Sequence, residues 1–400
     1  MAIDFESLSK PLPKKGKIKL WRWFALLIIF FLIGFIATLS YGYFFGISDF
    51  WFICCSGVTP FLLWSFCFVY KIYIRFYNNI YIEEWNYNCE KEHQHLIEFA
   101  KRGLYVVSHS LETSHGKYGN GVGVAESKLS LSTKPAGNHG LFFKYGSLTV
   151  PENIYPSDIP KRTELLFNNW LPDYQLILNQ LSSQLKLHVR IFIDTQITTD
   201  ELESIWLKTF GKFVKPTSFE INDSATSTTF IESWLDNSDY DSDLLLVINA
   251  HLFQSPTENE GEFASVILFA GEEAIEDPLL SDFKARTVKV HRSEQTSTLT
   301  ETLDKALLWG EDNQSDYDGI WTSQVSEEQN KSIMMHLNDI QFKLNNFFDV
   351  DFSIGSVRNC AYWLSLALAV ENSQENRKKQ LVLIGKPNVT AFVVAFPNQS

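Results

Sequence analysis

The chain has 400 residues, of which 45% are hydrophobic, so it is long enough for about two to three domains and for a sizeable core. Its formal net charge of -13 is unevenly divided: residues 1–80 contain eight Lys and Arg against three Asp and Glu, which is +5 and leaves -18 for residues 81–400. An acidic body of this kind argues against binding nucleic acid over a broad surface.

Two uncharged segments, residues 24–45 and 51–70, follow the basic N-terminus and are 22 and 20 residues long. Each can cross a hydrocarbon core of about 30 Å as a helix, and aromatic residues stand at the ends of both. We therefore predict a basic tail at residues 1–23 and a transmembrane helical hairpin at residues 24–75. A cleaved signal peptide fits poorly, because the first apolar segment is too long and a second follows at once. A buried hairpin of a soluble protein is the plainer alternative.

Basic residues flank the two spans on one side only. Six Lys and Arg precede the first span, and Lys71 and Arg75 follow the second, whereas the connection contains only Asp49. The positive-inside rule then places both termini in the cytoplasm, and we predict a multi-pass protein of the bacterial inner membrane. Three of the five cysteines lie in the second span, and no cysteine spacing suggests a zinc site or a disulfide framework.

After the hairpin, residues 76–102 have the pattern of a juxtamembrane helix. Residues 103–160 begin with a short strand and continue through Gly, Ser, His and Asn into further short strands or loops. From Pro160 onward helix and strand patterns alternate, and Thr198 precedes one helix as an N-cap. Nearly continuous apolar strands that alternate with helices predict an α/β body at residues 103–400, with its sheets covered on both faces.

The segment Asp223–Thr228, which reads D-S-A-T-S-T, opens a helix pattern and is followed by a strand after an acidic residue. This layout resembles the nucleophile loop D-T-A-C-S-S-S of the β-ketoacyl synthases, a family of the thiolase-like fold. Over residues 160–400 the order of later segments is similar to the same family: GEFASVILFAG, YDGIWTSQVSEEQ, IGSVRNCAYWLSLALAV and IGKPNVTAFVVAF. The resemblance implies a thiolase-like layered αβαβα body.

The catalytic side chains of that family do not carry over to this sequence. Thr226 stands where the cysteine would be, and a hydroxyl lacks the depressed pKa of a thiol at a helix N-terminus and needs an adjacent base. The first histidine loop falls on residues 321–324 and contains Ser323, the second histidine falls on Trp363, the lysine on Arg358, and the last turn contains Asn388. We therefore expect a pseudoenzyme with no catalytic residue, no cofactor and no metal, in which these five positions form a degenerate site.

Other candidate sites have plainer explanations. The glycines at 119, 121 and 123 form G-x-G-x-G, but a plain turn is favoured over a dinucleotide loop because no apolar helix pattern follows at once. His93 and His95 fit a solvated helix better than a metal site. The cluster His109, Glu112 and His115 leaves a metal or hydrolytic site open. No G-x-S-x-G elbow supports a Ser–His–Asp triad.

From these patterns we expect a non-catalytic, membrane-anchored accessory, adaptor or scaffold protein built on a pseudo-β-ketoacyl-synthase fold. One alternative is an acyl- or lipid-processing enzyme with non-standard residues such as Thr226, Ser227 or His109. Another is an adaptor or immunity-like component of a type VI-like secretion system. The expected partners are the lipid bilayer, an unidentified protein and a second copy through the strand at residues 242–253, with no nucleic acid.

Overall fold

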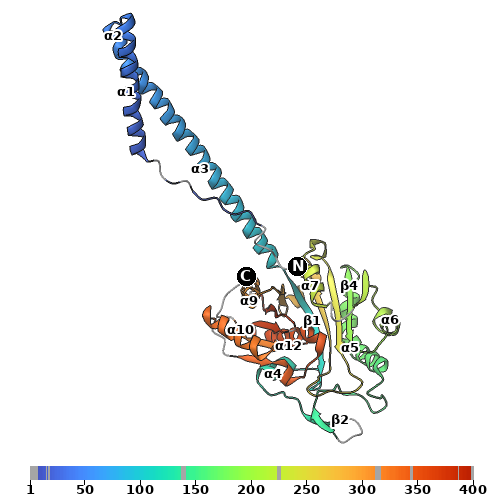
Figure 1. The fold of residues 1–400 in the computed structure, drawn as a ribbon. Helices are drawn as coiled ribbons and strands as arrows, with labels where there is room; N and C mark the ends of the chain where they lie inside the picture. The colour runs from blue at the N-terminus through green and yellow to red at the C-terminus, as the bar shows by residue number, and fades with distance from the viewer. Residues whose placement is uncertain are drawn as a thin grey trace. The chain divides into compact units, whose positions relative to one another are not determined.

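The computed structural model describes residues 8–14, 16, 19–136, 141–222, 227–310, 317–342, 346–385 and 387–397, without the side chains of residues 136 and 227–229 (Figure 1). The chain divides into two compact units, one at Asp4–Leu96 and one that contains Ile97–Ser400. The predicted segments around Thr226 therefore lie partly outside the described residues.

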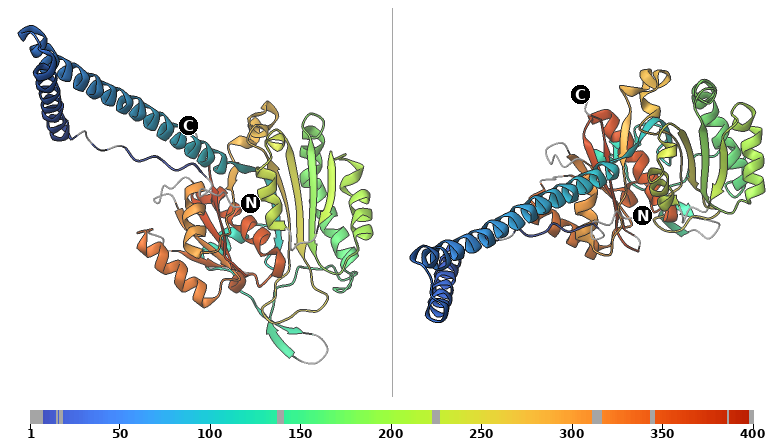
Figure 2. Two further views of the ribbon diagram at one scale, coloured as in Figure 1. Left: turned by 45° about the horizontal axis from the view of Figure 1, so that its top comes forward. Right: turned by 90° about the horizontal axis from the view of Figure 1, so that it is seen from above.

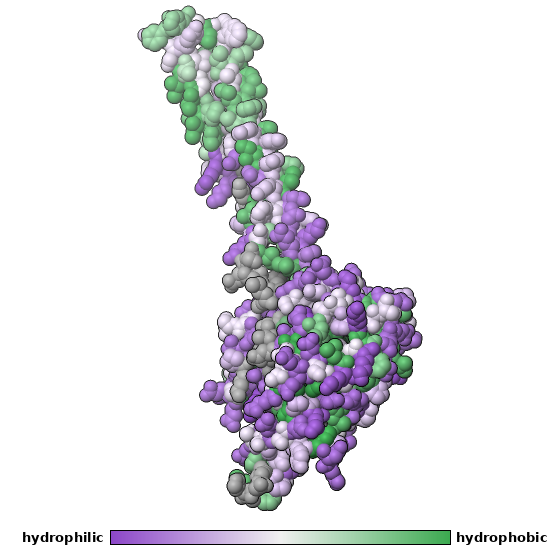
Figure 3. All heavy atoms as spheres, turned by 90° about the vertical axis from the view of Figure 1, so that its right-hand side faces the viewer, coloured by the Kyte–Doolittle hydropathy of each residue, from purple (hydrophilic) through white to green (hydrophobic). Residues whose placement is uncertain are grey.

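The N-terminal unit is a helical hairpin. Its elements are α1 (Leu20–Phe45), α2 (Asp49–Ile53), a π-helical turn (Cys54–Val58) and the long helix α3 (Thr59–Ala100). By length and composition, Leu20–Phe45 and the helix from Asp49 to Ala100 are able to cross a membrane, with mean hydropathies of 2.5 and 1.9 in their apolar windows. Hydrophobic residues dominate the surface of this part in Figure 3. The predicted juxtamembrane helix is continuous with the second apolar segment, because no helix-breaking residue separates them in α3.

The two apolar helices pack closely against each other. A Cβ at Gly34 would lie 2.3 Å from Pro60 Cγ, so only glycine allows this approach. Trp64 Nε1 donates a hydrogen bond to the carbonyl oxygen of Trp23 at 2.9 Å, and the rings of Trp23 and Phe68 meet edge to face. Small residues that let backbones approach are typical of helix pairs in membranes.

The body contains one ten-stranded sheet with the order β10-β9-β11-β12-β8-β1-β7-β6-β4-β5. The strands of its first half are β1 (Gly103–Thr113), β4 (Leu187–Asp194), β5 (Ser218–Asn222), β6 (Leu244–His251) and β7 (Phe263–Ala270). Those of its second half are β8 (Val288–His291), β9 (Tyr317–Ser323), β10 (Phe347–Asp349), β11 (Lys379–Ile384) and β12 (Thr390–Ala395).

The two halves have the same topology, although the sequence shows no repeat. Counted along the chain within each half, the second strand lies between the third and the fourth and is parallel to both. The fifth strand lies between the fourth and the first and is antiparallel to both. The first strands of the two halves, β1 and β8, pair antiparallel and join the halves into one sheet.

Helices cover both faces of each half. The outer helices of the first half are α5 (Ile159–Leu181) and α6 (Thr199–Lys208), those of the second half are α9 (Leu299–Trp309) and α10 (Glu327–Asp339), and α7 (Ser227–Leu235) and α12 (Ala361–Asn376) are central (Figures 1 and 2). Along β6, Leu245 and Val247 belong to the core around α12, whereas Leu244, Leu246 and Ile248 belong to the core under α5 and α6. A third core lies beneath α9 and α10. The predicted thiolase-like αβαβα layering is therefore confirmed.

The remaining described elements are short. They are the helices α4 (Asn120–Ala125), α8 (Ser281–Lys284) and α11 (Val350–Ser353) and the separate hairpin of β2 (Thr133–Ala136) and β3 (Leu141–Lys144). Single 3-10 turns occur at Phe210–Lys212, Ser238–Tyr240, Ala274–Glu276, Pro278–Leu280 and Arg358–Cys360. The predicted N-cap at Thr198 is confirmed, because its hydroxyl accepts from the backbone N–H of Glu201 and the Glu201 carboxylate accepts from that of Thr198.

The strand predicted to contact a second copy lies inside the sheet. Residues 242–253 contain β6, which pairs with β4 on one side and with β7 on the other. Its backbone N–H and C=O groups are thus used within the sheet. The edge strands of the ten-stranded sheet are β5 and β10.

Candidate functional site

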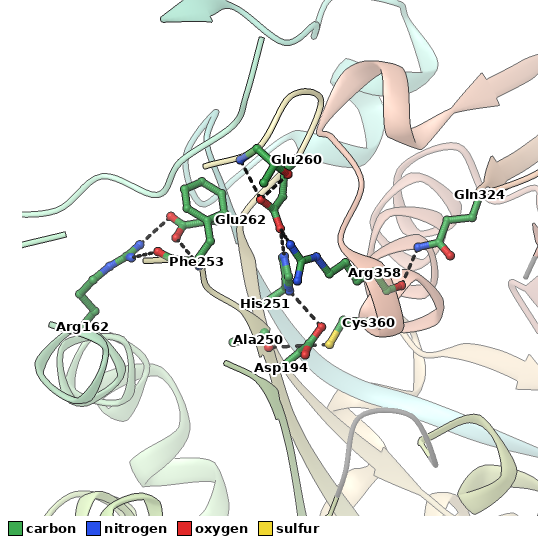
Figure 4. Close-up of polar contacts among 11 residues, drawn as sticks. Arg162, Asp194, Ala250, His251, Phe253, Glu260, Glu262, Gln324, Arg358 and Cys360 are labelled. Atoms are coloured by element: carbon green, nitrogen blue, oxygen red, sulfur yellow. Dashed lines mark hydrogen bonds and ion pairs between the residues drawn. The ribbon is translucent and has the colours of Figure 1, made fainter. Parts of the chain in front are cut away.

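The structure brings two of the predicted site positions together. Ser323 ends β9, and its hydroxyl donates to Asp351 Oδ1 at 2.8 Å, while the backbone N–H of Gln324 donates to Asp351 Oδ2 at 2.6 Å. The side-chain amide of Gln324 then donates to the carbonyl oxygen of Arg358 at 2.6 Å (Figure 4). Gln324 and Arg358 have φ angles of 56° and 51°, which non-glycine residues rarely adopt. Such strained residues concentrate at functional sites.

The other predicted positions do not join this group. Trp363 is fully buried in the first turn of α12, where its ring stacks on Phe192 with 5.7 Å between centroids. Asn388 is exposed in the turn between β11 and β12. Thr226 lies outside the described residues.

The glycine-rich segment after β1 packs against α12 and does not form a phosphate-binding loop. The Glu371 carboxylate accepts the backbone N–H groups of Gly119 and Gly121 at 2.6 and 2.7 Å. A Cβ at Gly121 would lie 2.4 Å from the carbonyl oxygen of Leu368. These glycines allow α4 to approach α12, and the donors that a phosphate would need are already used.

The site left open at His109, Glu112 and His115 is not assembled as one group of side chains. His109 and Glu112 both lie on β1, whereas His115 follows the strand and its Nε2 pairs with the carbonyl oxygen of Ser353 at 3.2 Å. Burial lowers the pKa of His109 to about 4, so its ring is neutral at pH 7. Within the described parts of the chain, no group of three metal-ligating side chains is assembled.

A different polar cluster lies at the carboxyl ends of β4 and β6 and was missed from the sequence. His251 donates from Nδ1 to Asp194 Oδ2 and from Nε2 to Glu260 Oε1, both at 3.2 Å. Arg358 Nη2 contacts the same Glu260 oxygen at 2.8 Å. Figure 4 shows the four side chains converging from β4, β6, the loop before β7 and the turn before α12.

The sheet itself explains this arrangement. Asp194 and His251 are the last residues of two parallel strands and are direct partners in the register of β4 and β6. Carboxyl ends of parallel strands are the usual ligand-binding edge of α/β sheets. The last residues of both strands are a short, mostly apolar stretch that ends in one ionisable residue, I-F-I-D and V-I-N-A-H, and this was the signal in the sequence.

The charges in the cluster hold one another in place. Burial lowers the pKa of His251, but the hydrogen bonds to Asp194 and Glu260 outweigh it and the pKa is raised overall. Burial raises the pKa of Glu260, but hydrogen bonds from His251 and Thr257 and the charge of Arg358 bring it down to about 2. The two carboxylates therefore favour the imidazolium form of His251.

A buried ion pair supports the loop that carries Glu260. Arg162 Nη2 donates to Glu262 Oε2 at 2.6 Å, and the side chains are 5% and 0% exposed. Glu262 also accepts the backbone N–H groups of Leu148 and Phe253, both at 2.9 Å. Every oxygen of Glu262 thus has a donor, which fixes both ends of residues 253–262.

The cluster borders a cavity of about 470 Å³. Besides the four charged residues, the polar side chains of Thr195, Gln196, Gln254 and Ser255 line it. Within the cluster, the side chain of Asp194 is 26% exposed and that of Arg358 60%, whereas His251 and Glu260 are 3% exposed. The lining provides an acid, an anion-binding cation and hydroxyl and amide groups, which suits a polar group of a ligand.

Cys360 lies beside this cluster but is inert. Its Sγ contacts the carbonyl oxygen of Ala250 at 3.7 Å, and burial raises its pKa well above the ordinary value. A nucleophilic cysteine needs the opposite shift.

No protein-family model and no curated protein matches the chain. Solved structures do. A variant of OleA from Xanthomonas campestris is 10% identical and covers 74% of this chain and 98% of its own, with a TM-score of 0.42. The peroxisomal thiolase of Saccharomyces cerevisiae is 8% identical over 76% and 99%, with a TM-score of 0.47, and the ishigamide ketosynthase/chain length factor is 11% identical over 73% and 99%, with a TM-score of 0.45.

The mixed α/β body with one large sheet agrees with the thiolase-like layering expected from the sequence. The expectation that the chain is not an enzyme is contradicted by these comparisons, because the solved structures that it resembles are enzymes. That expectation rested on the missing cysteine and histidines of one family. Such an argument overlooks acid–base groups that stand elsewhere in the fold, as His251 does here.

Proposed function

We propose that the chain is a membrane-anchored enzyme of the thiolase-like fold that processes an acyl or lipid substrate with site residues of its own. The observation that carries the proposal is the His251 ring held between the carboxylates of Asp194 and Glu260 at the edge of a polar cavity. Catalytic acids are often found where burial and charged partners shift a pKa, as they do here. The apolar helices of the N-terminal unit support a place at the bilayer.

His251 is the general acid of this proposal. The Asp194 carboxylate is the more exposed of its two partners, so an oxygen or sulfur atom of the substrate entering the cavity can take the place of Asp194 at Nδ1. Water or a lipid hydroxyl attacks the acyl carbonyl, the C–S or C–O bond to the leaving group breaks, and the Nδ1 proton passes to the leaving group. The neutral ring keeps its Nε2–H bond to Glu260, and the proton of the attacking hydroxyl restores the imidazolium. Proton transfer by a positioned histidine contributes about 10²–10⁴-fold to a rate.

Arg358 has a binding role. Its guanidinium is largely exposed while one nitrogen stays on Glu260, so the remaining donors are able to bind a carboxylate or phosphate of the substrate. Its contact also keeps Glu260 ionised, which in turn keeps His251 protonated.

For localisation we propose a multi-pass protein of the bacterial inner membrane with both termini in the cytoplasm. The basic flanks of the two apolar segments support this orientation.

The test uses the full chain in vesicles of phosphatidylethanolamine and phosphatidylglycerol with added acyl-CoA, and mass spectrometry to measure released fatty acid, CoA and acylated lipid. We expect turnover by the wild type and at least a tenfold loss in His251→Gln. His188→Gln is the matched control, because His188 is also buried between strands and paired with Asp243, but borders neither the cavity nor the cluster. No turnover by the wild type, or equal rates in wild type and His251→Gln, would refute the proposal.

A further inference from the structure

A basic N-terminal tail and an acidic stretch of α3 lie within the same unit. Residues 8–19 contain five lysines and no acidic residue, whereas residues 79–96 of α3 contain four glutamates and one lysine. The basic tail and the acidic stretch of α3 therefore attract each other electrostatically. The tail also carries the sequence K-P-L-P at residues 10–13.

The tail contacts α3 at four points between Arg75 and Asn86. Trp85 Nε1 donates to the carbonyl oxygen of Lys10 at 3.2 Å. Leu12 donates its backbone N–H to Asn86 Oδ1 at 2.7 Å and accepts from Asn86 Nδ2 at 3.1 Å.

Further along, Lys14 Nζ lies 3.8 Å from Glu83 Oε1, and Arg75 donates to the carbonyl oxygen of Gly16. The contacts use every second tail residue from Lys10 to Gly16, as expected for an extended chain, and they run antiparallel to the helix. An extended chain spans about 20 Å over six residues, and α3 rises about 15 Å over the ten residues between Arg75 and Trp85, so the two lengths match.

Asn86 binds the backbone of Leu12, and the prolines on either side of Leu12 make this binding specific for that residue. Pro11 and Pro13 have no N–H, so Leu12 carries the only backbone donor between Lys10 and Lys14, and Asn86 binds that donor and the carbonyl of the same residue. A following proline also restricts Lys10 and Leu12 to extended conformations. Pre-extended proline segments bind at low entropic cost to surfaces with an aromatic donor, here Trp85.

Burial marks the same face of α3. Ile82 and Cys89 lie four residues before and three residues after Asn86, so they share its face of the helix. They are 6% and 9% exposed, whereas their neighbours Tyr81 and Tyr87 are 54% and 65% exposed. The helix is thus covered on the face that binds the tail.

We propose that the stretch of α3 centred on Trp85 and Asn86 is a binding site for an extended proline-containing segment, and that residues 10–16 of the same chain occupy it. The tail then acts as a strap that closes the hairpin. It holds the N-terminus and residues 83–86 on the same side of the membrane. This constraint on topology is independent of the positive-inside rule.

The test is zero-length cross-linking of the full chain in phosphatidylcholine nanodiscs with a carbodiimide. This reagent joins an amine to a carboxylate with loss of water, so only ion pairs in contact react. We expect a Lys14–Glu83 amide in the tryptic mass spectrum, in clear preference to links from Lys14 to Glu84, Glu90 or Glu92. Asn86→Ala should lower its yield at least threefold.

Asn88→Ala is the matched control, because it is the same exchange on an exposed face of α3, and it should leave the yield unchanged. Alanine favours helix at both positions, so neither variant disturbs α3. A Lys14–Glu83 link that is absent, equal to the links with the other glutamates, or insensitive to Asn86→Ala would overturn the proposal.

Discussion

Replacing Arg162 with methionine should destabilise the body more than any exchange on its surface. The change leaves the Glu262 carboxylate, which is 0% exposed, without its ion-pair partner. Two backbone N–H groups still bind Glu262, so it stays in place as an uncompensated charge. Removing one partner of a buried ion pair costs about 3–5 kcal/mol. For a body of this size, 1 kcal/mol shifts Tm by about 2 °C, so we expect a decrease of about 6–10 °C.

The assay is urea and thermal unfolding of the full chain in detergent, followed by tryptophan fluorescence. Lys284→Met is the control, because Lys284 and Glu276 also form an ion pair at 2.6 Å but are 53% and 64% exposed, and an exposed pair contributes about 0–1 kcal/mol. The double variant Arg162→Met, Glu262→Gln should recover part of the loss, because it removes the stranded charge. A loss below about 1 kcal/mol in Arg162→Met would refute the reasoning about this pair.

Four further outcomes are expected. A C-terminal GFP fusion should fluoresce and a C-terminal alkaline phosphatase fusion should be inactive, and the opposite pair of results would reverse the proposed topology. Ser326→Ala should lower the unfolding free energy by about 0.5–2 kcal/mol, because Ser326 caps α10 in a capping box; an unchanged urea midpoint would exclude that role. Trp363→Ala should cost about 3–5 kcal/mol by the same measurement, since it empties the centre of the core around α12, and a smaller loss would mean that the core collapses around the gap. In unfolding measured against pH, Glu260 should contribute to the free energy of unfolding above its ordinary pKa of 4.5, and this contribution should be lost as the pH falls toward 2. The contribution of His251 should be full below pH 6.5 and lost as the pH rises through the raised pKa of the ring. A His251→Gln variant that keeps the loss of stability at alkaline pH would contradict this assignment.

The layered fold could be predicted from the sequence because it follows from local patterns, apolar strands and capped helices, that recur along the chain. Apolar strands such as Leu244–His251 and capped helices such as Thr199–Lys208 follow from composition and spacing alone. The matching topology of the two halves was not accessible, because strand order depends on long-range pairing and not on local sequence. The same limit applies to the place of β6, which is set by its pairing with β4 and β7.

The predicted site was only partly assembled, for a related reason. A family pattern pointed to Ser323 and Arg358, which do meet through Gln324. Asp194 and His251 do not belong to that family pattern; they lie 57 residues apart and meet only through the register of β4 and β6. The accessory role and the secretion-system role stay predictions without a contact among the described residues that bears on them.

The most direct test of the account is the protonation state of His251 in the full chain. We propose nitrogen-15 NMR of histidine-labelled protein between pH 6 and 9, with the His251 signals assigned as those absent from His251→Gln. The account predicts that the ring loses its second proton at a pH above 6.5, because the two carboxylates favour the imidazolium. A neutral ring at pH 7.5, with a transition at or below pH 6.5, would contradict the proposed acid and the function that rests on it.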